Sequence, residues 1–183
     1  MRVLVYGFGP YRQFRDNITA RIVESLPKTA TLNKEIFDVR FGRRQFIAAL
    51  KRHRPDIVLG LGQSSRKRIE FEAGARNRRR PNPSTPSRPI CRGRPKWLPT
   101  TLKLGSVGGF GKSNNAGDYV CNYSMYVLLD EIERQRLHVK FGFIHIPHEG
   151  SMKKAMAVVR KVLRQCCREG YRVSRRNASR YFS

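Results

Sequence analysis

The side chains of this 183-residue sequence that are best suited to nucleophilic chemistry are four cysteines and four histidines. Cys121 stands in SNNAGDYVCNYSMY, where a glycine-containing turn leads into an apolar pattern typical of a helix. Its sulfur is therefore expected at a helix N-terminus, where free N–H groups and the dipole lower a thiol pKa and can bind an oxyanion. Asp118 would oppose this effect if it lay close. The alternative is that Cys121 is simply a small buried hydrophobic residue.

The remaining cysteines are Cys91, Cys166 and Cys167, and none of the four forms a C-x-x-C pair. This spacing supports neither a zinc site nor a disulfide framework. Cys121 is thus a candidate nucleophile that needs a base.

His145 is the preferred base, because it closes an apolar run and would lie at the end of a strand. Ile144 and Ile146 flank it, so its side chain would point away from theirs. A structural histidine is the alternative interpretation. The other three histidines are weaker candidates. His148 follows in the next loop, His53 lies on a basic helix, and His138 precedes the strand and should lie at the far rim.

Glu70 and Glu72 are the only acids in an arginine-rich region, and an extended segment would place both on one face. Either carboxylate could hold an imidazole in its productive tautomer. Both could equally neutralise nearby guanidinium groups, and the sequence leaves this open.

The elements that must position these groups alternate along the chain. Strand patterns cover residues 2–6, 36–41, 56–62 and 139–146, and helix patterns cover 17–26, 43–53, 122–137 and 151–168. The alternation predicts an α/β fold of three α/β/α layers, with a mostly parallel twisted sheet and helices on both faces. The segments GFGP, GQSS and HIPH would then open onto one rim, which Cys121 can reach.

One domain is expected over residues 1–183. A further extended piece is expected at 66–73, followed by a basic, proline-rich loop at about 74–100 and a frayed basic tail from about 174. The segment GSVGGFGKS at 105–113 resembles a phosphate-binding loop, but Ser106 stands where that motif needs glycine. Nucleotide hydrolysis is therefore not favoured.

The net charge of +25 is the least usual property of the composition. Such a field attracts polyanions, so nucleic acid is one expected partner and a solvated basic loop is the other explanation. No stretch is apolar enough for a membrane span, and the N-terminus has no secretory pattern. We therefore expect no membrane partner and a cytoplasmic location.

Four blocks together resemble the pyroglutamyl-peptidase I (pyrrolidone-carboxylate peptidase) family of cysteine peptidases. They are VLVYGFGPY at 3–11, PDIVLGLGQ at 55–63, NNAGDYVCNYSMY at 114–126 and GFIHIP at 142–147, with a weaker match in IEFEAGARN at 69–77. The resemblance implies a hydrolase, a thiol exopeptidase that removes N-terminal pyroglutamate from peptides through a thioacyl-enzyme. It implies that Cys121 is the nucleophile, His145 the base and Glu72 the supporting carboxylate, with Glu70 as the fallback.

The resemblance also implies a substrate pocket in which apolar walls hold the lactam ring and main chain binds its amide. The walls would be Phe8, Tyr11, Tyr119 and Val120, and the main chain would be that around Gln63. No cofactor or metal is implied, and a homo-oligomer, by resemblance a tetramer, is expected. The chain departs from the family at GARNRRRP and between Pro99 and Asn114, where the family has a helix. The alternative function is a catalytically weak relative whose basic surface binds nucleic acid or another polyanion.

Overall fold

A computed structural model describes residues 1–11, 14–103 and 110–178. In this part of the chain, six strands form one sheet in the order β2-β1-β3-β8-β4-β7. β1 (Val3–Phe8), β2 (Leu32–Phe37), β3 (Ile57–Ser64) and β8 (Lys140–Pro147) are parallel to one another, whereas β4 (Glu70–Glu72) runs antiparallel to β8 and pairs in parallel with β7 (Gly111–Ser113). The predicted mostly parallel sheet is confirmed.

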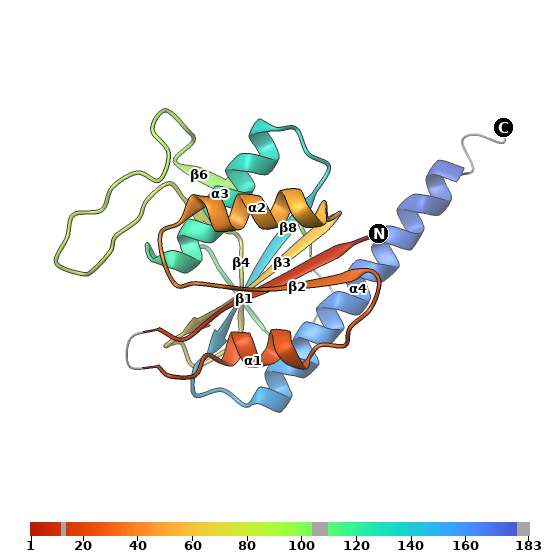
Figure 1. Cartoon of the computed structure of the whole chain (residues 1–183), viewed down its shortest axis with the longest axis horizontal. Coiled ribbons are helices and arrows are strands. Elements are labelled where there is room, and N and C mark those ends of the chain that lie inside the picture. The colour runs from red at the N-terminus through yellow and green to blue at the C-terminus, as the bar shows by residue number, and fades with distance from the viewer. Residues whose placement is uncertain (12–13, 104–109, 179–183) are drawn as a thin grey trace.

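Helices cover both faces of the sheet, as the α/β prediction requires (Figure 1). α2 (Arg43–His53) and α3 (Val120–Arg134) pack on one face, and α1 (Ile18–Ser25) and α4 (Met152–Ala178) pack on the other. Alternate strand residues separate accordingly: Tyr6 and Phe143 face α2 and α3, while Val5 and Ile144 face α1 and α4. A period of two along each strand therefore builds two cores.

The helix boundaries follow from local chemistry. Asn17 caps α1 by accepting a hydrogen bond from the Thr19 N–H at 3.0 Å. α2 begins and ends at the residues that its apolar pattern predicted, and Arg54 ends it in the left-handed conformation (φ 41°) just before Pro55. No described helix is long and apolar enough to cross a membrane.

Several predicted limits were wrong. The second strand lies at Leu32–Phe37 rather than at 36–41, because the chain leaves the sheet at Phe37 and turns into α2. Within the expected piece at 66–73, only Glu70–Glu72 forms a strand. Residues 174–178, where the sequence predicted fraying, continue α4; the rest of that predicted tail, 179–183, lies outside the described residues, as do residues 104–109 of the rejected phosphate-loop match.

The segment expected as a loop at about 74–100 begins and ends in a two-stranded ribbon. β5 (Gly74–Arg76) pairs antiparallel with β6 (Trp97–Pro99). Between them, the Asn77 side chain bonds four backbone groups, which are the N–H groups of Ile90 and Cys91 and the carbonyls of Cys91 and Arg94. One amide thus gathers the two ends of the excursion.

A cluster of charged side chains fastens this excursion to the helices behind it. Asp130 of α3 is 2% exposed, and its two oxygens contact Arg94 Nε of the loop at 2.6 Å and Arg43 Nη2 of α2 at 3.2 Å. Glu131 is also buried and contacts Arg43 at 3.1 Å. Some of the many arginines therefore form ion pairs that hold the fold together.

Candidate active site

The nucleophile candidate lies at the second residue of α3, on the face of the sheet that α2 and α3 cover. Gly117, in the turn before the helix, has φ 80°, a conformation that glycine adopts without strain. The helix cap, Tyr119, makes no side-chain hydrogen bond to the helix start. The first N–H groups of α3 are thus not consumed by a capping side chain, and they lie beside Cys121.

The side chain of Asn122 fixes the start of α3 against the arginine-rich segment. It is fully buried, accepts from the Arg76 N–H and donates to the carbonyls of Arg76 and Arg78, each at 2.8 Å. Asp118 pairs with Arg80 at 2.9 Å. These contacts hold the residues on either side of Cys121.

The sulfur of Cys121 reaches across to β3. A methyl group at position 62 would lie 2.8 Å from Cys121 Sγ and 2.7 Å from the Phe143 ring, so Gly62 leaves the room that the thiol occupies. Gly62 is the register partner of His145 on the neighbouring strand. Because partners in a parallel pair point their Cβ atoms to one face, His145 projects to the face on which the thiol lies.

The imidazole of His145 meets one of the two candidate carboxylates. His145 Nδ1 lies 2.6 Å from Glu72 Oε1, and both side chains are buried, with exposed fractions of 5% and 0%. Glu70 pairs with His145 in the backbone register, yet its carboxylate turns to Arg66. The structure therefore joins His145 to Glu72 on the sheet face where the Cys121 sulfur lies, and it leaves Glu70 outside the imidazole contact.

Arg66 is the charged group that the sequence did not single out. Its Nη1 contacts Glu70 Oε2 and, at 2.6 Å, the same Glu72 oxygen that meets His145. Its spacing of four and six residues from the two glutamates was a signal, but Arg66 stood in a run of basic residues. Arg79, a later arginine of the same basic region, lies over the Phe41 ring at 5.7 Å.

Electrostatics at the site favour an ionised glutamate and a neutral thiol. Burial raises the pKa of the Glu72 carboxyl, but His145, the Ser113 side chain and Arg66 together hold that pKa below its ordinary value. Burial, and then the Glu72 charge, raises the pKa of the Cys121 thiol to about 12. The expectation that the helix N-terminus lowers this pKa was wrong, because desolvation outweighs it, and Glu72 rather than Asp118 is the opposing acid.

A small pocket of about 190 Å³ opens beside the thiol. All of the predicted wall residues line it, and the Tyr11 ring packs at a tilt against Tyr119 with ring centroids 5.2 Å apart. The Gln63 side chain accepts from the Ile18 N–H at 3.1 Å, which ties the pocket floor to α1. The lining comprises Phe8, Tyr11, Gln63, Tyr119, Val120 and Cys121, which were expected, and Phe14, Asn17, Val39, Ser64, Ser65 and His148, which were not.

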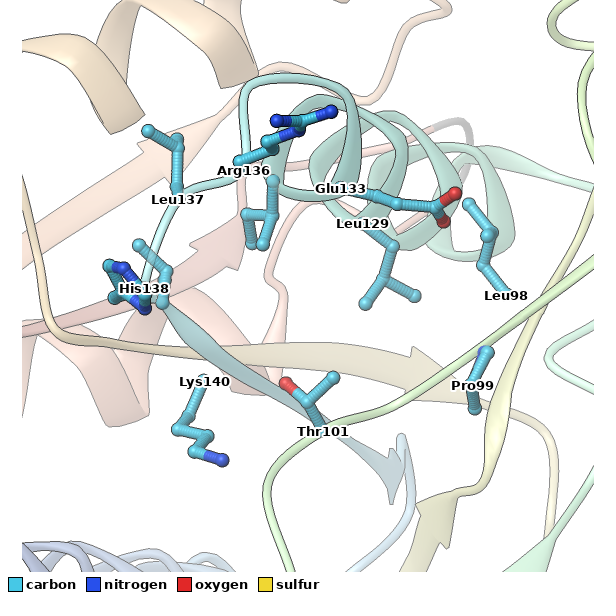
Figure 2. A pocket seen from close by; sticks show the side chains of 11 residues that line it. Leu98, Pro99, Thr101, Leu129, Glu133, Arg136, Leu137, His138 and Lys140 are labelled. Atoms are coloured by element: carbon cyan, nitrogen blue, oxygen red, sulfur yellow. The ribbon is translucent and has the colours of Figure 1, made fainter.

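Of the four histidines, His148 lines this pocket, whereas His145, His53 and His138 are not among its lining residues. The His148 ring meets the Phe14 ring edge to face, with centroids 5.3 Å apart. His53 contacts Glu35 at 2.5 Å. His138 lines a larger hollow of about 480 Å³ between the C-terminal end of α3 and the start of β8 (Figure 2), at the far rim as predicted. None of the three assembled side chains lines that hollow.

No metal site is formed by the described residues, since no group of three or more His, Cys, Asp or Glu is arranged to hold an ion. Cys91, Cys121 and Cys166 are free thiols. The chemistry that Cys121, His145 and Glu72 offer is that of a thiol, an imidazole and a supporting carboxylate.

Comparison with known proteins agrees with this geometry. The pyroglutamyl peptidase family profile matches residues 104–162. The pyrrolidone-carboxylate peptidase of Thermococcus kodakarensis is 31% identical over 208 residues, covering 93% of this chain and all of that protein. That of Thermococcus onnurineus is 33% identical and covers 84% of this chain and 88% of its own length.

Solved structures give the same result. A mutant pyrrolidone carboxyl peptidase from Pyrococcus furiosus superposes with a TM-score of 0.82 at 25% identity, over 92% of this chain and 99% of that one. The enzyme from Thermococcus litoralis shares the fold, with a TM-score of 0.81 at 20% identity. This chain belongs to the pyroglutamyl peptidase family of cysteine peptidases.

Proposed function

We propose that this protein removes N-terminal pyroglutamate from peptides, with Cys121 as nucleophile, His145 as general base and acid, and Glu72 as the carboxylate that orients His145. The observation that carries the proposal is the 2.6 Å contact between His145 and Glu72 on the sheet face where the Cys121 sulfur lies. The relatives named pyrrolidone-carboxylate peptidase supply the substrate class.

The pocket supports a small, uncharged ring as substrate. Its volume of about 190 Å³ and its aromatic walls suit a five-membered lactam, which offers flat faces and an amide. None of the described residues that line the pocket is acidic, so a free α-ammonium group would be buried there without a counter-charge from them. Pyroglutamate lacks that ammonium group, which explains why the ring fits and an ordinary N-terminus does not.

The resting thiol is neutral, so the reaction must begin with proton transfer. Cys121 gives its proton to His145 as sulfur attacks the pyroglutamyl carbonyl carbon and a C–S bond forms. Glu72 stabilises the imidazolium through Nδ1, which leaves Nε2 for the exchange. The first N–H groups of α3 receive the negative charge on the carbonyl oxygen.

The second half of the cycle reverses these roles. The imidazolium of His145 protonates the leaving amine as the C–N bond breaks, which leaves a thioester on Cys121. Water then attacks the thioester carbonyl while neutral His145 takes its proton. Pyroglutamate departs, and the thiolate recovers its proton from His145.

The proposal is tested by fluorophore release from a pyroglutamyl aminomethylcoumarin amide, with the prolyl amide as a matched control. The prolyl ring has the same size but carries a protonated amine in place of the lactam. We expect turnover of the pyroglutamyl amide alone, lost in Cys121→Ala and His145→Ala. Equal turnover of both amides, or none of either, would overturn the assignment.

The expectations about partners, oligomeric state, location and domain limits are not part of this proposal. The polyanion-binding alternative depends on the net charge alone, so we do not propose it as a second function. A homo-oligomeric state and a cytoplasmic location stay predictions, as does the assignment of residues 1–183 to one domain.

A further inference from the structure

Arg66 joins parts of the site that come from different elements. Its Nη1 contacts Glu70 and Glu72, while its Nη2 donates to the carbonyl of Asn115. Its side chain is partly buried, with 28% of its surface exposed. One planar group thus connects the carboxylate that meets His145 with a segment on the other side of the site.

That segment leads directly to the nucleophile. The Asn115 side-chain oxygen accepts from the Gly117 N–H at 3.3 Å, and α3 begins at Val120 with Cys121 next. Asn115 therefore ties the chain at the start of the turn that presents the sulfur, and Asp118 ties it again through Arg80. The Arg66 contact fixes that point relative to Glu72.

We infer that Arg66 is a positioning residue that holds Glu72 against His145 and, through the Asn115 carbonyl, sets the place of the turn that presents Cys121. The inference rests on the proposed function for its kinetic consequences, but the geometry stands without it. Among the described residues, Arg66 hydrogen-bonds to neither the thiol nor the imidazole, and it acts through Glu72 and Asn115.

A guanidinium suits this task better than an ammonium. Its donors lie in a rigid plane and point in fixed directions, so Nη1 and Nη2 can serve two partners at once. A lysine would keep the positive charge but offers one compact head group on a flexible stem. Substitution by lysine can therefore separate the positive charge of Arg66 from its contact with the Asn115 carbonyl.

The charged, titratable and hydrogen-bonding groups around Glu72 determine how the site responds to pH. His145 faces it from β8, Arg66 from the loop after β3, Ser113 from β7, Cys121 from α3 and Glu70 from its own strand. Without Arg66 the pKa of Glu72 rises, because a lowering charge is lost and Glu70 remains. The same charge opposes the effect of Glu72 on the thiol, so its loss also disfavours the thiolate.

The test compares Arg66→Gln and Arg66→Lys with Arg52→Gln. Arg52 also pairs with a glutamate, contacting Glu35 at 2.7 Å, and lies on the far end of α2, so its substitution controls for losing one charge and one ion pair. For Arg66→Gln we expect kcat to fall by about tenfold to a hundredfold with KM little changed, because the reacting groups are misplaced. The acidic limb of the kcat profile should move up by about one pH unit.

Arg66→Lys should separate the two effects: the acidic limb stays near that of the wild type while kcat still falls, because the Asn115 tether is lost. Arg52→Gln should match the wild type in both. A wild-type kcat and pH profile in Arg66→Gln would overturn the inference. The inference would also be overturned if kcat fell, the acidic limb of the pH profile did not move and the melting temperature dropped as well. That combination is the signature of a structural role alone.

A substrate-free measurement keeps this inference separate from the proposed function. The rate of iodoacetamide alkylation at Cys121, followed by peptide mass spectrometry at pH 8, should fall several-fold in Arg66→Gln and stay unchanged in Arg52→Gln. If the wild type hydrolyses no pyroglutamyl amide but this difference is found, the proposed function fails and the role of Arg66 stands. An unchanged alkylation rate overturns the role of Arg66 whatever the hydrolysis assay shows.

Discussion

The sulfur of Cys121 occupies the space next to Gly62 that any other residue would fill with its own side chain. A Cβ atom at position 62 would lie 2.8 Å from Sγ, which is closer than real Cβ contacts come. Gly62 is also the strand partner of His145. The absence of a side chain at one position of β3 thus lets the thiol approach the strand next to the imidazole.

Gly62→Ala should therefore damage both stability and activity. The added methyl group meets Cys121 Sγ and the Phe143 ring, and we expect a loss of about 1–3 kcal/mol in the free energy of unfolding. Turnover should fall further than stability explains, because the thiol is displaced. Urea denaturation and turnover of the pyroglutamyl amide measure the two effects.

Gly9→Ala is the matched control, since the nearest atoms to a methyl group there lie at 3.8 Å and 3.9 Å. Its free energy of unfolding should change by no more than about 0.5 kcal/mol. If Gly62→Ala were as stable and as active as Gly9→Ala, the thiol would not lie where the structure places it.

Glu72→Gln and Glu70→Gln test which carboxylate supports the imidazole. Glu72 meets His145 Nδ1 and Glu70 does not, so Glu72→Gln should reduce kcat by about a hundredfold to ten-thousandfold. Glu70→Gln removes one arginine contact and should cost about tenfold at most. Steady-state kinetics of both variants decide between them, and equal losses would refute a special role for Glu72.

The raised pKa of Cys121 predicts how stability depends on alkaline pH. Because the folded thiol stays protonated up to about pH 12, its contribution is complete below the ordinary thiol pKa and is lost as the unfolded chain ionises. Above about pH 8.5, the wild type should lose about 1.4 kcal/mol of unfolding free energy per pH unit relative to Cys121→Ser. Urea denaturation of both proteins at several pH values measures the difference; parallel curves would show that the resting thiol is not desolvated.

The lowered pKa of Glu72 predicts the opposite pH dependence of stability, with a loss as the pH falls. Its stabilising contribution is complete above the ordinary glutamate pKa and is lost as pH falls through the lower folded value. The stability gap between wild type and Glu72→Gln should therefore narrow as the pH falls below about 4.3. A gap that is constant from neutral to acidic pH would contradict the ionised state of Glu72.

Asp130→Asn should loosen the arginine-rich excursion between β5 and β6. The carboxylate bridges Arg94 and Arg43 from a buried position, and its loss removes the charged partner that the two arginines share. We expect a cost of about 2–4 kcal/mol and faster tryptic cleavage after the loop arginines. Glu133→Gln, whose carboxylate is exposed and contacts Arg94 at 3.5 Å, is the control and should be cleaved at the wild-type rate.

The sequence predicted the layers of this fold and the rim at which the site lies, because buried strands and amphipathic helices carry strong periodic signals. The residue pattern alone could not choose between Glu70 and Glu72, since a spacing of two puts both on one face, and the family resemblance was needed to favour Glu72. The role of Arg94 and Asp130 was also hidden, because that pairing joins residues far apart in the chain.

The thiol pKa shows a different limit of sequence reasoning. The position of Cys121 at a helix start was predicted correctly, and the general effect of a helix start on a thiolate is favourable. How far burial outweighs this effect depends on Tyr119, Phe143 and the strands packed around the sulfur. The sequence does not reveal that enclosure.

The most direct test of the central claim is acid quenching of the wild type during turnover of a pyroglutamyl amide, followed by mass spectrometry of the peptide that contains Cys121. We predict that this peptide carries one pyroglutamyl group as a thioester, and that the adduct is absent in Cys121→Ala. Fluorophore release that continues undiminished in Cys121→Ala, with no adduct in the wild type, would contradict the account.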